Sequence, residues 1–249
     1  MIRGLYTAAA GMMTNIIRQQ ANTNNLANVA TIGYKEDSTV YTPAPEMAIG
    51  DPTAARPRIL GPLATGIEVS GVETNLAPGS LKETNNPFDF ALDGEGFFTV
   101  QSETGQRYYT RNGAWDRDAT GRLVTSTGEL VLGEHGPIQL PEGQVVVAGD
   151  GSISVDGQFV DRLQLSTFPD GTVIQKVGNT LFEPTDANIQ PVAAQNVTVM
   201  QGYVETSNVD EVRAMVEMMS ALRAYEAEQR TLQIQDQALG LAVSELGKV

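Results

Sequence analysis

The sequence predicts an α+β fold in which long N- and C-terminal helices, of the coiled-coil type, flank a central all-β domain. Three observations predict it. Apolar side chains recur every three or four residues near the N-terminus, and every seven residues near the C-terminus. Between about residues 81 and 200, short β-type runs alternate with turn signals.

The N-terminal helix carries one narrow, mostly apolar stripe. Its positions alternate in spacing between three and four residues: Ile2, Leu5, Ala9, Met12, Ile16, Gln19, Thr23 and Leu26. This spacing is typical of a heptad seam, which here becomes polar at Gln19 and Thr23. We expect its apolar members to pack against another helix: Leu5, Ala9, Met12, Ile16 and Leu26.

The helix is expected to end within NNLANVATIGYK, residues 24–35. Asparagine is a poor residue for a helix interior, because its short amide competes for backbone hydrogen bonds. At a helix end, however, the amides of Asn24, Asn25 and Asn28 can bond backbone groups that lack an intrahelical partner. Gly33 then permits a turn, and Tyr34 can anchor the departing strand.

The chain between the helices divides in two by composition. Residues 36–80 are rich in Pro, Gly and Thr, which predicts an extended connecting segment with turns. Residues 81–204 contain β-type runs separated by pairs such as Asn112-Gly113 and Asp156-Gly157, which favour hairpins. We therefore predict a β-rich domain at 81–204 and a helical domain formed by 1–35 together with 205–249.

The C-terminal helix has the most regular period in the chain. Its apolar stripe repeats every seven residues: Met218, Tyr225, Leu232, Leu239 and Leu246. Met215, Leu222 and Val243 fill companion positions, while Gln229 and Asp236 interrupt them. We expect Ser207 or Asn208 to cap the first turn, with Asp210 and Glu211 near its positive end.

Two one-sided helices at the ends of a chain must each bury their apolar stripe. We expect the N-terminal seam to face Met218, Tyr225, Leu232 and Leu239, either within one chain or between copies. The alternative is that both helices lie on the β-sheet, but a long helix with a narrow seam suits another helix better.

Composition excludes several classes of function. The net charge is −14, with 30 acidic and 16 basic residues, which argues against nucleic acid and anionic membranes as partners. The absence of cysteine excludes a disulfide scaffold and a thiolate metal site, and His135 is the one histidine. No apolar run is long enough to span a membrane. Only Gly4, Leu5 and Tyr6 would form the apolar region of a signal peptide, so we expect none to be cleaved.

Local motifs give no enzyme or cofactor site. Asp116, Asp118 and Gly121 match part of a calcium loop, but Thr127 stands where the bidentate Glu belongs, which favours a hairpin. Gly94 and Gly96 lack the third glycine of a dinucleotide motif. We therefore predict no catalytic residue, no metal, no cofactor and no small-molecule substrate.

Three separate stretches resemble the rod, hook and hook-associated axial proteins of the bacterial flagellum. The first is the family's N-L-A-N helix end with its T-x-G-[FY]-K exit: Asn25, Leu26, Ala27, Asn28, Thr31, Gly33, Tyr34 and Lys35. The second lies near the C-terminus, with S-N-V at Ser207, Asn208 and Val209 and R-A-Y-E at 223–226. NPFDFALDGEGFFTV and YTRNGAW are similar to the β-domain signature of the family.

The resemblance favours the basal-body rod proteins of the FlgG and FlgF kinds and leaves the choice between them open. It implies a structural subunit, exported through the type III apparatus, that assembles into a helical tube and transmits torque. Its partners would be copies of itself, other rod and hook proteins and the surrounding ring proteins, with the β-rich domain outermost. The alternatives are a hook or adaptor protein of the same family, and a periplasmic enzyme acting on peptidoglycan.

Overall fold

The computed structural model describes residues 2–43, 47–51, 58–63, 66–169, 171–186 and 188–246. Its contacts divide the chain into two compact units. The helical unit comprises Met1–Ala27, Asp37–Glu73 and Asp210–Val249, and the β unit comprises Asn28–Glu36 and Thr74–Val209. The three-part division that the sequence suggests, with boundaries after 35, 80 and 204, stays a prediction.

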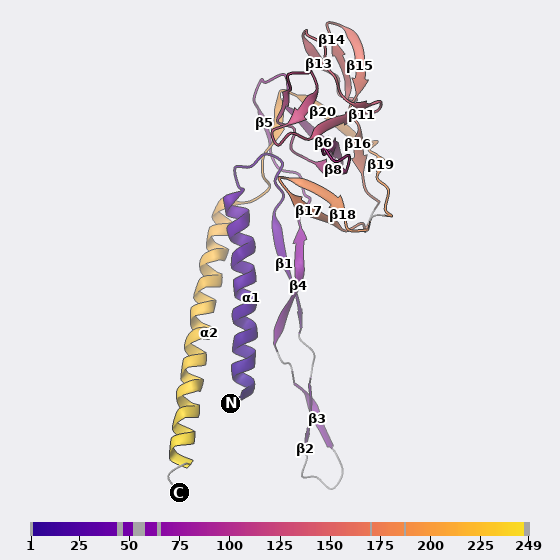
Figure 1. Cartoon of the computed structure of the whole chain (residues 1–249). Helices are drawn as coiled ribbons and strands as arrows, with labels where there is room; N and C mark the ends of the chain where they lie inside the picture. Colours follow the sequence, from indigo (N-terminus) through magenta and orange to yellow (C-terminus); the bar gives the residue numbers. More distant parts are fainter. Residues whose placement is uncertain are drawn as a thin grey trace. The chain divides into compact units, whose positions relative to one another are not determined.

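The helical unit holds both described helices of the chain, α1 (Ile2–Ala27) and α2 (Glu211–Leu246). It also holds β1 (Asp37–Pro43), β2 (Met47–Asp51), β3 (Arg58–Leu63) and most of β4 (Ile67–Thr74). β1 pairs with β4, and β2 pairs antiparallel with β3 (Figure 1). Much of the Pro-rich stretch predicted to be a connecting segment is therefore paired strand.

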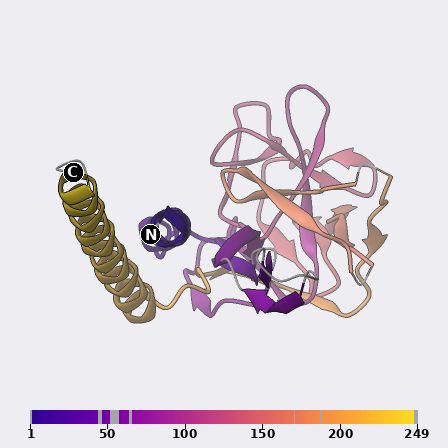
Figure 2. The ribbon, with the colours of Figure 1, turned by 90° about the horizontal axis from the view of Figure 1, so that it is seen from below.

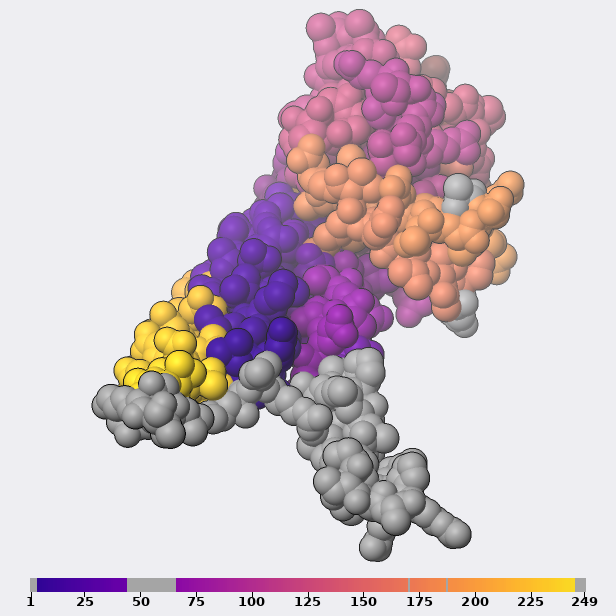
Figure 3. All heavy atoms as spheres, turned by 60° about the horizontal axis from the view of Figure 1, so that its bottom comes forward, coloured from indigo at the N-terminus to yellow at the C-terminus, as the bar shows by residue number. Residues whose placement is uncertain are grey.

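The two helices lie side by side and run in opposite directions (Figures 1 and 2). Gly4 lies beside Gln235 and Gly11 beside Glu228, so positions rise along α1 as they fall along α2. Figure 3 shows their surfaces in contact. Asn15 donates a hydrogen bond from Nδ2 to Glu228 Oε2 at 3.1 Å.

The coiled-coil type that we predicted for the fold class is wrong. Where the two helices meet, α1 presents Gly4 and Gly11, and α2 presents polar Glu228 and Gln235. The buried side chains of the two helices are small or polar: Ala8, Ala21, Asn22, Asn25, Ala214 and Ala221. The predicted companion positions Met215, Leu222 and Val243 are 42%, 44% and 70% exposed. A coiled-coil seam needs large apolar side chains at both of its repeating positions, and here one of the two is small or polar.

The β unit is built almost entirely of antiparallel pairs of short strands. They are β5 (Leu81–Glu83), β6 (Phe90–Gly94), β7 (Phe97–Gln101), β8 (Arg107–Thr110), β9 (Trp115–Arg117), β10 (Leu123–Thr125), β11 (Leu130–Gly133), β12 (Gly136–Pro137), β13 (Val145–Val147), β14 (Ser152–Val155), β15 (Gln158–Arg162), β16 (Leu165–Thr167), β17 (Ile174–Gly178), β18 (Leu181–Pro184), β19 (Val192–Ala193), β20 (Val197–Gln201) and β21 (Tyr203–Glu205).

One large sheet organises these strands. Its order is β17-β18-β8-β7-β11-β10-β9, with β12 on β11, and with β16 on β7 and β19. A three-stranded sheet, β13-β14-β15, and the pairs β20-β6 and β21-β5 complete the unit. Asp156 and Gly157 connect β14 to β15 with φ of 51° and 82°, as the Asp-Gly signal predicts for a tight hairpin.

The hairpin predicted at residues 116–127 is present. β9 pairs antiparallel with β10, and Asp118 organises the turn between them. Its carboxylate accepts hydrogen bonds from the backbone N–H groups of Thr120 and Arg122, both at 2.8 Å. The Thr120 hydroxyl and Arg122 add further bonds, and together these hold the pKa of Asp118 well below its usual range.

An aromatic cluster forms the centre of the β unit. Trp115 packs between Phe90 and Phe98, with ring centroids 4.9 Å and 4.6 Å from its own. Val100 and Val131 lie in the same buried cluster. Because aliphatic and aromatic side chains from many strands meet here, the unit has a continuous core of its own.

His135 is held by one buried carboxylate. Its Nδ1 lies 2.8 Å from Asp161 Oδ1, and this hydrogen bond raises the pKa of His135 above its ordinary value of about 6.5. A raised pKa means that the charged pair stabilises the fold well below pH 6.5. This stabilisation is lost as the pH rises through the pKa of the folded state.

We expect an NMR titration of His135 to give a pKa above 6.5, and Asp161→Asn to lower it. Because the chain has one histidine, its ring resonances need no assignment by mutation. A wild-type pKa at or below 6.5 would contradict the pairing.

Candidate functional site

Four stretches of chain meet around one buried carboxylate in the β unit. Glu205 ends β21, and its Oε1 accepts hydrogen bonds from Lys35 Nζ at 2.5 Å and from Gly79 N at 2.8 Å. Its Oε2 accepts from Arg111 Nη1 at 3.2 Å. The side chains of Glu205, Lys35 and Arg111 are only 1%, 1% and 5% exposed. We call these three residues the junction cluster.

The two cations of the junction cluster exceed its single anion, and backbone carbonyls help to satisfy them. Lys35 Nζ also donates to Ala77 O at 2.8 Å, and Arg111 Nη2 donates to Gly94 O at 2.7 Å. Burial lowers the pKa of Lys35 and of Arg111, and the neighbouring Glu205 opposes that effect. The cluster therefore depends on Glu205 to hold two buried positive charges.

The N-terminal motif enters the β unit beside this cluster. After α1 ends at Ala27, Thr31 N donates to Asn28 O at 3.0 Å and closes a turn. Gly33 N then donates to Glu205 O at 2.8 Å. Gly33 has a φ of 70°, and a Cβ on it would lie 2.4 Å from the backbone nitrogen of Asn112. Only glycine fits this position without displacing backbone.

The side chains around Gly33 are also fixed. Tyr34 is buried, and Lys176 Nζ lies 4.0 Å from the centroid of its ring. Lys176 also donates to Lys35 O at 2.5 Å. In the helical unit, Asn25 bonds the backbone of Asp37 twice, donating from Nδ2 to O at 2.8 Å and accepting at Oδ1 from N at 2.9 Å. Asn25 thus bonds the backbone at the start of β1, and the predicted bonding of the unpaired backbone groups at the helix end stays a prediction.

The S-N-V motif shares a backbone acceptor, Ala77 O, with Lys35 of the cluster. Asn208 accepts from Glu36 N at 2.7 Å and donates from Nδ2 to Asn75 O and Ala77 O, both at 2.9 Å. Ser207 Oγ accepts from Val209 N at 3.2 Å, and Val209 is buried. One amide therefore bonds two chain segments that are far apart in sequence.

The predicted cap of the C-terminal helix lies elsewhere. Asp210 Oδ1 accepts a hydrogen bond from Arg213 N at 3.0 Å, and α2 begins at Glu211. Asp210 therefore caps α2, and the expectation that Ser207 or Asn208 does so is wrong. Both residues belong to the β unit. Their side chains bond Glu36, Asn75, Ala77 and Val209.

The predicted seam residues are spread over partly buried and exposed positions. Leu5, Met12 and Leu26 are half-buried, whereas Ala9 and Ile16 are exposed. On α2, the residues spaced by seven are all half-buried: Met218, Tyr225, Leu232 and Leu239. Direct pairing between the two sets stays a prediction.

Several large apolar side chains of the helices are exposed in the single chain. On α1 these are Tyr6, Met13 and Ile16. On α2 they begin in the first turns: Val212, Met215, Val216, Met219 and Leu222. The spacing of the α2 set places it on one side of the helix. Contiguous exposed apolar surface of this kind marks an interaction site.

The described residues provide little for chemistry. They hold no group of three or more His, Cys, Asp or Glu side chains arranged to bind a metal ion. Neither α1 nor α2, as described, has an apolar stretch that could cross a membrane.

Sequence reasoning missed the partners of the junction cluster. Lys35 belongs to the exit motif and Arg111 to the stretch YTRNGAW, and Glu205 lies two residues before the S-N-V motif. One signal was available in the sequence: Glu205 directly follows the apolar Val204. In the structure, both residues lie at the end of the short strand β21 and their side chains are buried. Nothing local to Glu205 identifies Lys35 and Arg111 as its partners.

Two family descriptions match the chain. "Flagellar hook protein FlgE/F/G D1 domain" matches residues 91–160, within the β unit. "Flagellar basal body rod FlgEFG protein C-terminal" matches residues 200–244, which include the S-N-V motif and most of α2. Both matches place the chain among the axial proteins of the flagellum.

Relatives extend this similarity over nearly the whole chain. The flagellar basal-body rod protein FlgG of Buchnera aphidicola (subsp. Acyrthosiphon pisum) is 32% identical, over 96% of this chain and 98% of its own. The rod protein FlgF of Escherichia coli K12 is 31% identical over 97% of each chain. The hook-basal body complex protein FlhO of Bacillus subtilis 168 is 28% identical over the full length of both chains.

The chain belongs to the family of flagellar basal-body rod proteins. It is a structural subunit of the rod, located in the flagellar basal body, and it assembles with other flagellar axial proteins. The family is a non-enzymatic one, so its membership confirms the prediction of a structural protein and excludes the peptidoglycan enzyme that we considered.

We expect Glu205→Gln to lower the free energy of unfolding of the β unit by about 3–5 kcal/mol, because two buried cations lose their counter-charge. Glu134→Gln removes a carboxylate from an exposed pair with Arg162 and should cost at most about 1 kcal/mol. Urea unfolding followed by circular dichroism measures both.

The loss of unfolding free energy caused by Glu205→Gln should become smaller as the pH is raised towards 10, because Lys35 can then lose its proton in the folded state. Equal stability of the two variants would show that the junction cluster is not required for the fold.

We expect Gly33→Ala to destabilise the β unit by roughly 3 kcal/mol or more, since it combines a left-handed φ with a backbone collision. Gly157→Ala shares the left-handed φ (82°) but meets no atom within 4 Å, so it should cost only about 1–2 kcal/mol. Comparing the thermal unfolding of the two variants separates the cost of the backbone collision from the cost of the left-handed φ. A Gly33→Ala effect no larger than that of Gly157→Ala would contradict the close approach.

Proposed function

We propose that the chain assembles into the rod as a helical polymer with copies of itself and with other rod and hook proteins. The exposed apolar stripe of α2 (Val212, Met215, Val216, Met219 and Leu222) carries this proposal. Apolar surface of this extent is unfavourable in water, and neighbouring subunits would bury it.

We also assign a role in assembly to the predicted seam residues of both helices, which are half-buried or exposed. On α1 we assign this role to the predicted seam, Leu5, Ala9, Met12, Ile16 and Leu26, and on α2 to Met218, Tyr225, Leu232 and Leu239. A polymer that transmits torque needs repeated contacts that do not close into a ring of two, and a one-sided helix surface can supply them.

The junction motifs would fix the backbone of the stretches that adjoin the two helices in sequence. The motif residues concerned are Asn25, Leu26, Ala27, Asn28, Thr31, Gly33, Tyr34, Ser207, Asn208 and Val209. Their hydrogen bonds fix the stretches next to the end of α1 and the start of α2. A subunit that transmits torque would need such fixed connections.

Export and location complete the proposal. We infer passage through the type III apparatus to the periplasmic part of the basal body, where the rod would also touch the surrounding ring proteins. The absence of cysteine supports this route, because an unfolded chain that enters an oxidising compartment cannot then form wrong disulfides.

We expect Met219→Lys to abolish swimming and to remove the chain from isolated basal bodies, because it places a charge in the apolar stripe. Met219 is 52% exposed, so the isolated subunit should keep its helix content by circular dichroism.

Thr231→Lys is the matched control, since it adds the same charge at an exposed polar position of α2. Normal swimming with Met219→Lys would refute the role of the stripe. Equal failure of both variants would show that added charge, and not loss of the stripe, is the cause.

A further inference from the structure

The hairpin formed by β17 and β18 stands at one end of the large sheet of the β unit. β18 pairs with β8, and β17 pairs with β18 as the first strand in the order. Lys176 of β17 is in register with Phe182 of β18, which is fully buried. Residues that lie directly opposite in an antiparallel pair project from the same face, so Lys176 lies on the face that buries Phe182.

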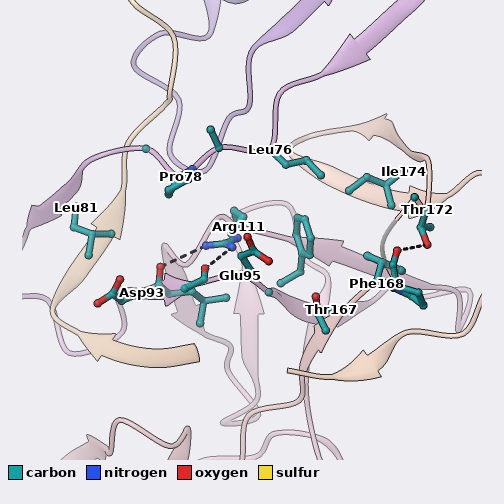
Figure 4. Close-up of a pocket in the computed structure, with 18 residues that line it drawn as sticks. Leu76, Pro78, Leu81, Asp93, Glu95, Arg111, Thr167, Phe168, Thr172 and Ile174 are labelled. Carbon is teal, nitrogen blue, oxygen red and sulfur yellow. Dashed lines mark hydrogen bonds between the residues drawn. The ribbon is translucent and has the colours of Figure 1, made fainter. Parts of the chain in front are cut away.

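Apolar packing holds the base of this hairpin. Ile174, two residues before Lys176, packs against a buried aromatic cluster that includes Phe97 and Phe182. Figure 4 shows Ile174 lining the same pocket as Arg111 of the junction cluster. The strand that carries Lys176 is therefore fixed by buried side chains as well as by its hydrogen bonds to β18.

The turn of the hairpin has a strained backbone. Asn179 and Thr180 have φ of 49° and 61°, both in the left-handed region. Asparagine adopts this conformation readily, whereas for a β-branched residue such as threonine it is unfavourable. The register of β17 on β18 also shifts between Lys176 and Gly178. Backbone strain of this kind persists only where the surrounding structure imposes it, and it is concentrated at functional positions.

A hydrogen-bonded path leads from this turn to the exit motif that contains Gly33. Thr110 donates from Oγ1 to Thr180 O at 3.0 Å, and the same hydroxyl accepts from Asn112 N at 3.0 Å. The backbone of Asn112 is what Gly33 approaches so closely that a Cβ would lie 2.4 Å from its nitrogen. The strained turn is thus connected, through one hydroxyl, to the backbone that contacts Gly33.

Lys176 contacts the two residues that follow Gly33. Its ammonium lies 4.0 Å from the centroid of the Tyr34 ring and donates to Lys35 O at 2.5 Å. An ammonium over the face of an aromatic ring is attracted by the ring, and the attraction is stronger where water is excluded. Tyr34 is buried, so water is largely excluded from its ring. The hairpin therefore holds the exit motif at Gly33 and again at residues 34–35.

We propose that Lys176 is a positioning residue that holds Gly33, Tyr34 and Lys35 in a single backbone conformation. The inference rests on the proposed function, in which the stretches that adjoin the helices must be fixed. It adds the β17–β18 hairpin as the element that fixes the first of these stretches. Lys176 is only half-buried, so removal of its ammonium should leave the fold intact and loosen residues 33–35 selectively.

Lys176→Met tests this role, because methionine keeps most of the length of the side chain and loses its charge and its donor. Amide hydrogen exchange of the full chain, followed by mass spectrometry of its peptides, measures the effect. Exchange in a peptide that covers residues 28–36 should become about tenfold faster, since a cation–π contact and a charged hydrogen bond are lost. Exchange in a peptide that covers the buried strand β7 should stay within about twofold of the wild-type rate.

Two further variants serve as controls. Lys176→Arg keeps a cation and its donors, so it should retain the slow exchange of residues 28–36. Lys82→Met removes the same charge from an exposed position of β5 and should leave that exchange unchanged. If Lys176→Met accelerated exchange equally in the 28–36 and β7 peptides, the loss would be one of general stability, and the positioning role would be wrong.

Swimming of cells that carry each variant separates this inference from the proposed function. Lys176→Met should slow swimming, whereas Lys176→Arg and Lys82→Met should swim at the wild-type speed. Wild-type exchange of residues 28–36 in Lys176→Met would refute the role of Lys176 alone. Faster exchange of those residues together with normal swimming would instead refute the requirement for a fixed connection in the rod.

Discussion

The carboxylate of Glu205 is the interaction on which the β unit depends most. It receives Lys35 from the exit of the first helix, Arg111 from the loop after β8 and the backbone N–H of Gly79 before β5. Each buried charge would be costly alone, and removal of one leaves the others without compensation. Three distant segments are therefore fixed by one side chain, and the fold at this point is specified by charge as well as by apolar packing.

The stretches that hold this cluster lie next to the two helices in sequence. Residues 28–36 and 205–209 continue from α1 and lead into α2, yet both belong to the β unit. Asn208 adds a second connection, because it bonds Glu36, Asn75 and Ala77 with one amide. The stretch that follows α1 and the stretch that precedes α2 are therefore hydrogen-bonded to each other within the β unit. The asparagine and glycine motifs in the sequence are explained by these bonds, since each occupies a position that few other residues could take.

Local patterns in the sequence predicted the local structure, and long-range contacts escaped them. Periodicity located both helices, and Asp156-Gly157 marked a hairpin that the structure contains. Spacing could not show which repeating positions of α2 are buried, and Ala221 is buried while Leu222 is exposed. Helix packing through small residues satisfies the same heptad period, so the period alone did not distinguish the two. Glu205 pairs with residues 94 and 170 positions away, and no local pattern encodes that distance.

The two units differ in how their side chains are buried. The β unit buries Trp115, its aromatic neighbours and a fully engaged ion cluster, so it can be stable by itself. The helices meet through glycines and the polar pair Asn15 and Glu228, and they leave Met219 and its neighbours in solvent. Polar contacts of this kind contribute little net free energy, because water competes for the same groups. In the assembly proposed above, neighbouring subunits would bury this apolar surface of the helices, and that burial would add free energy that the contact within one chain does not supply.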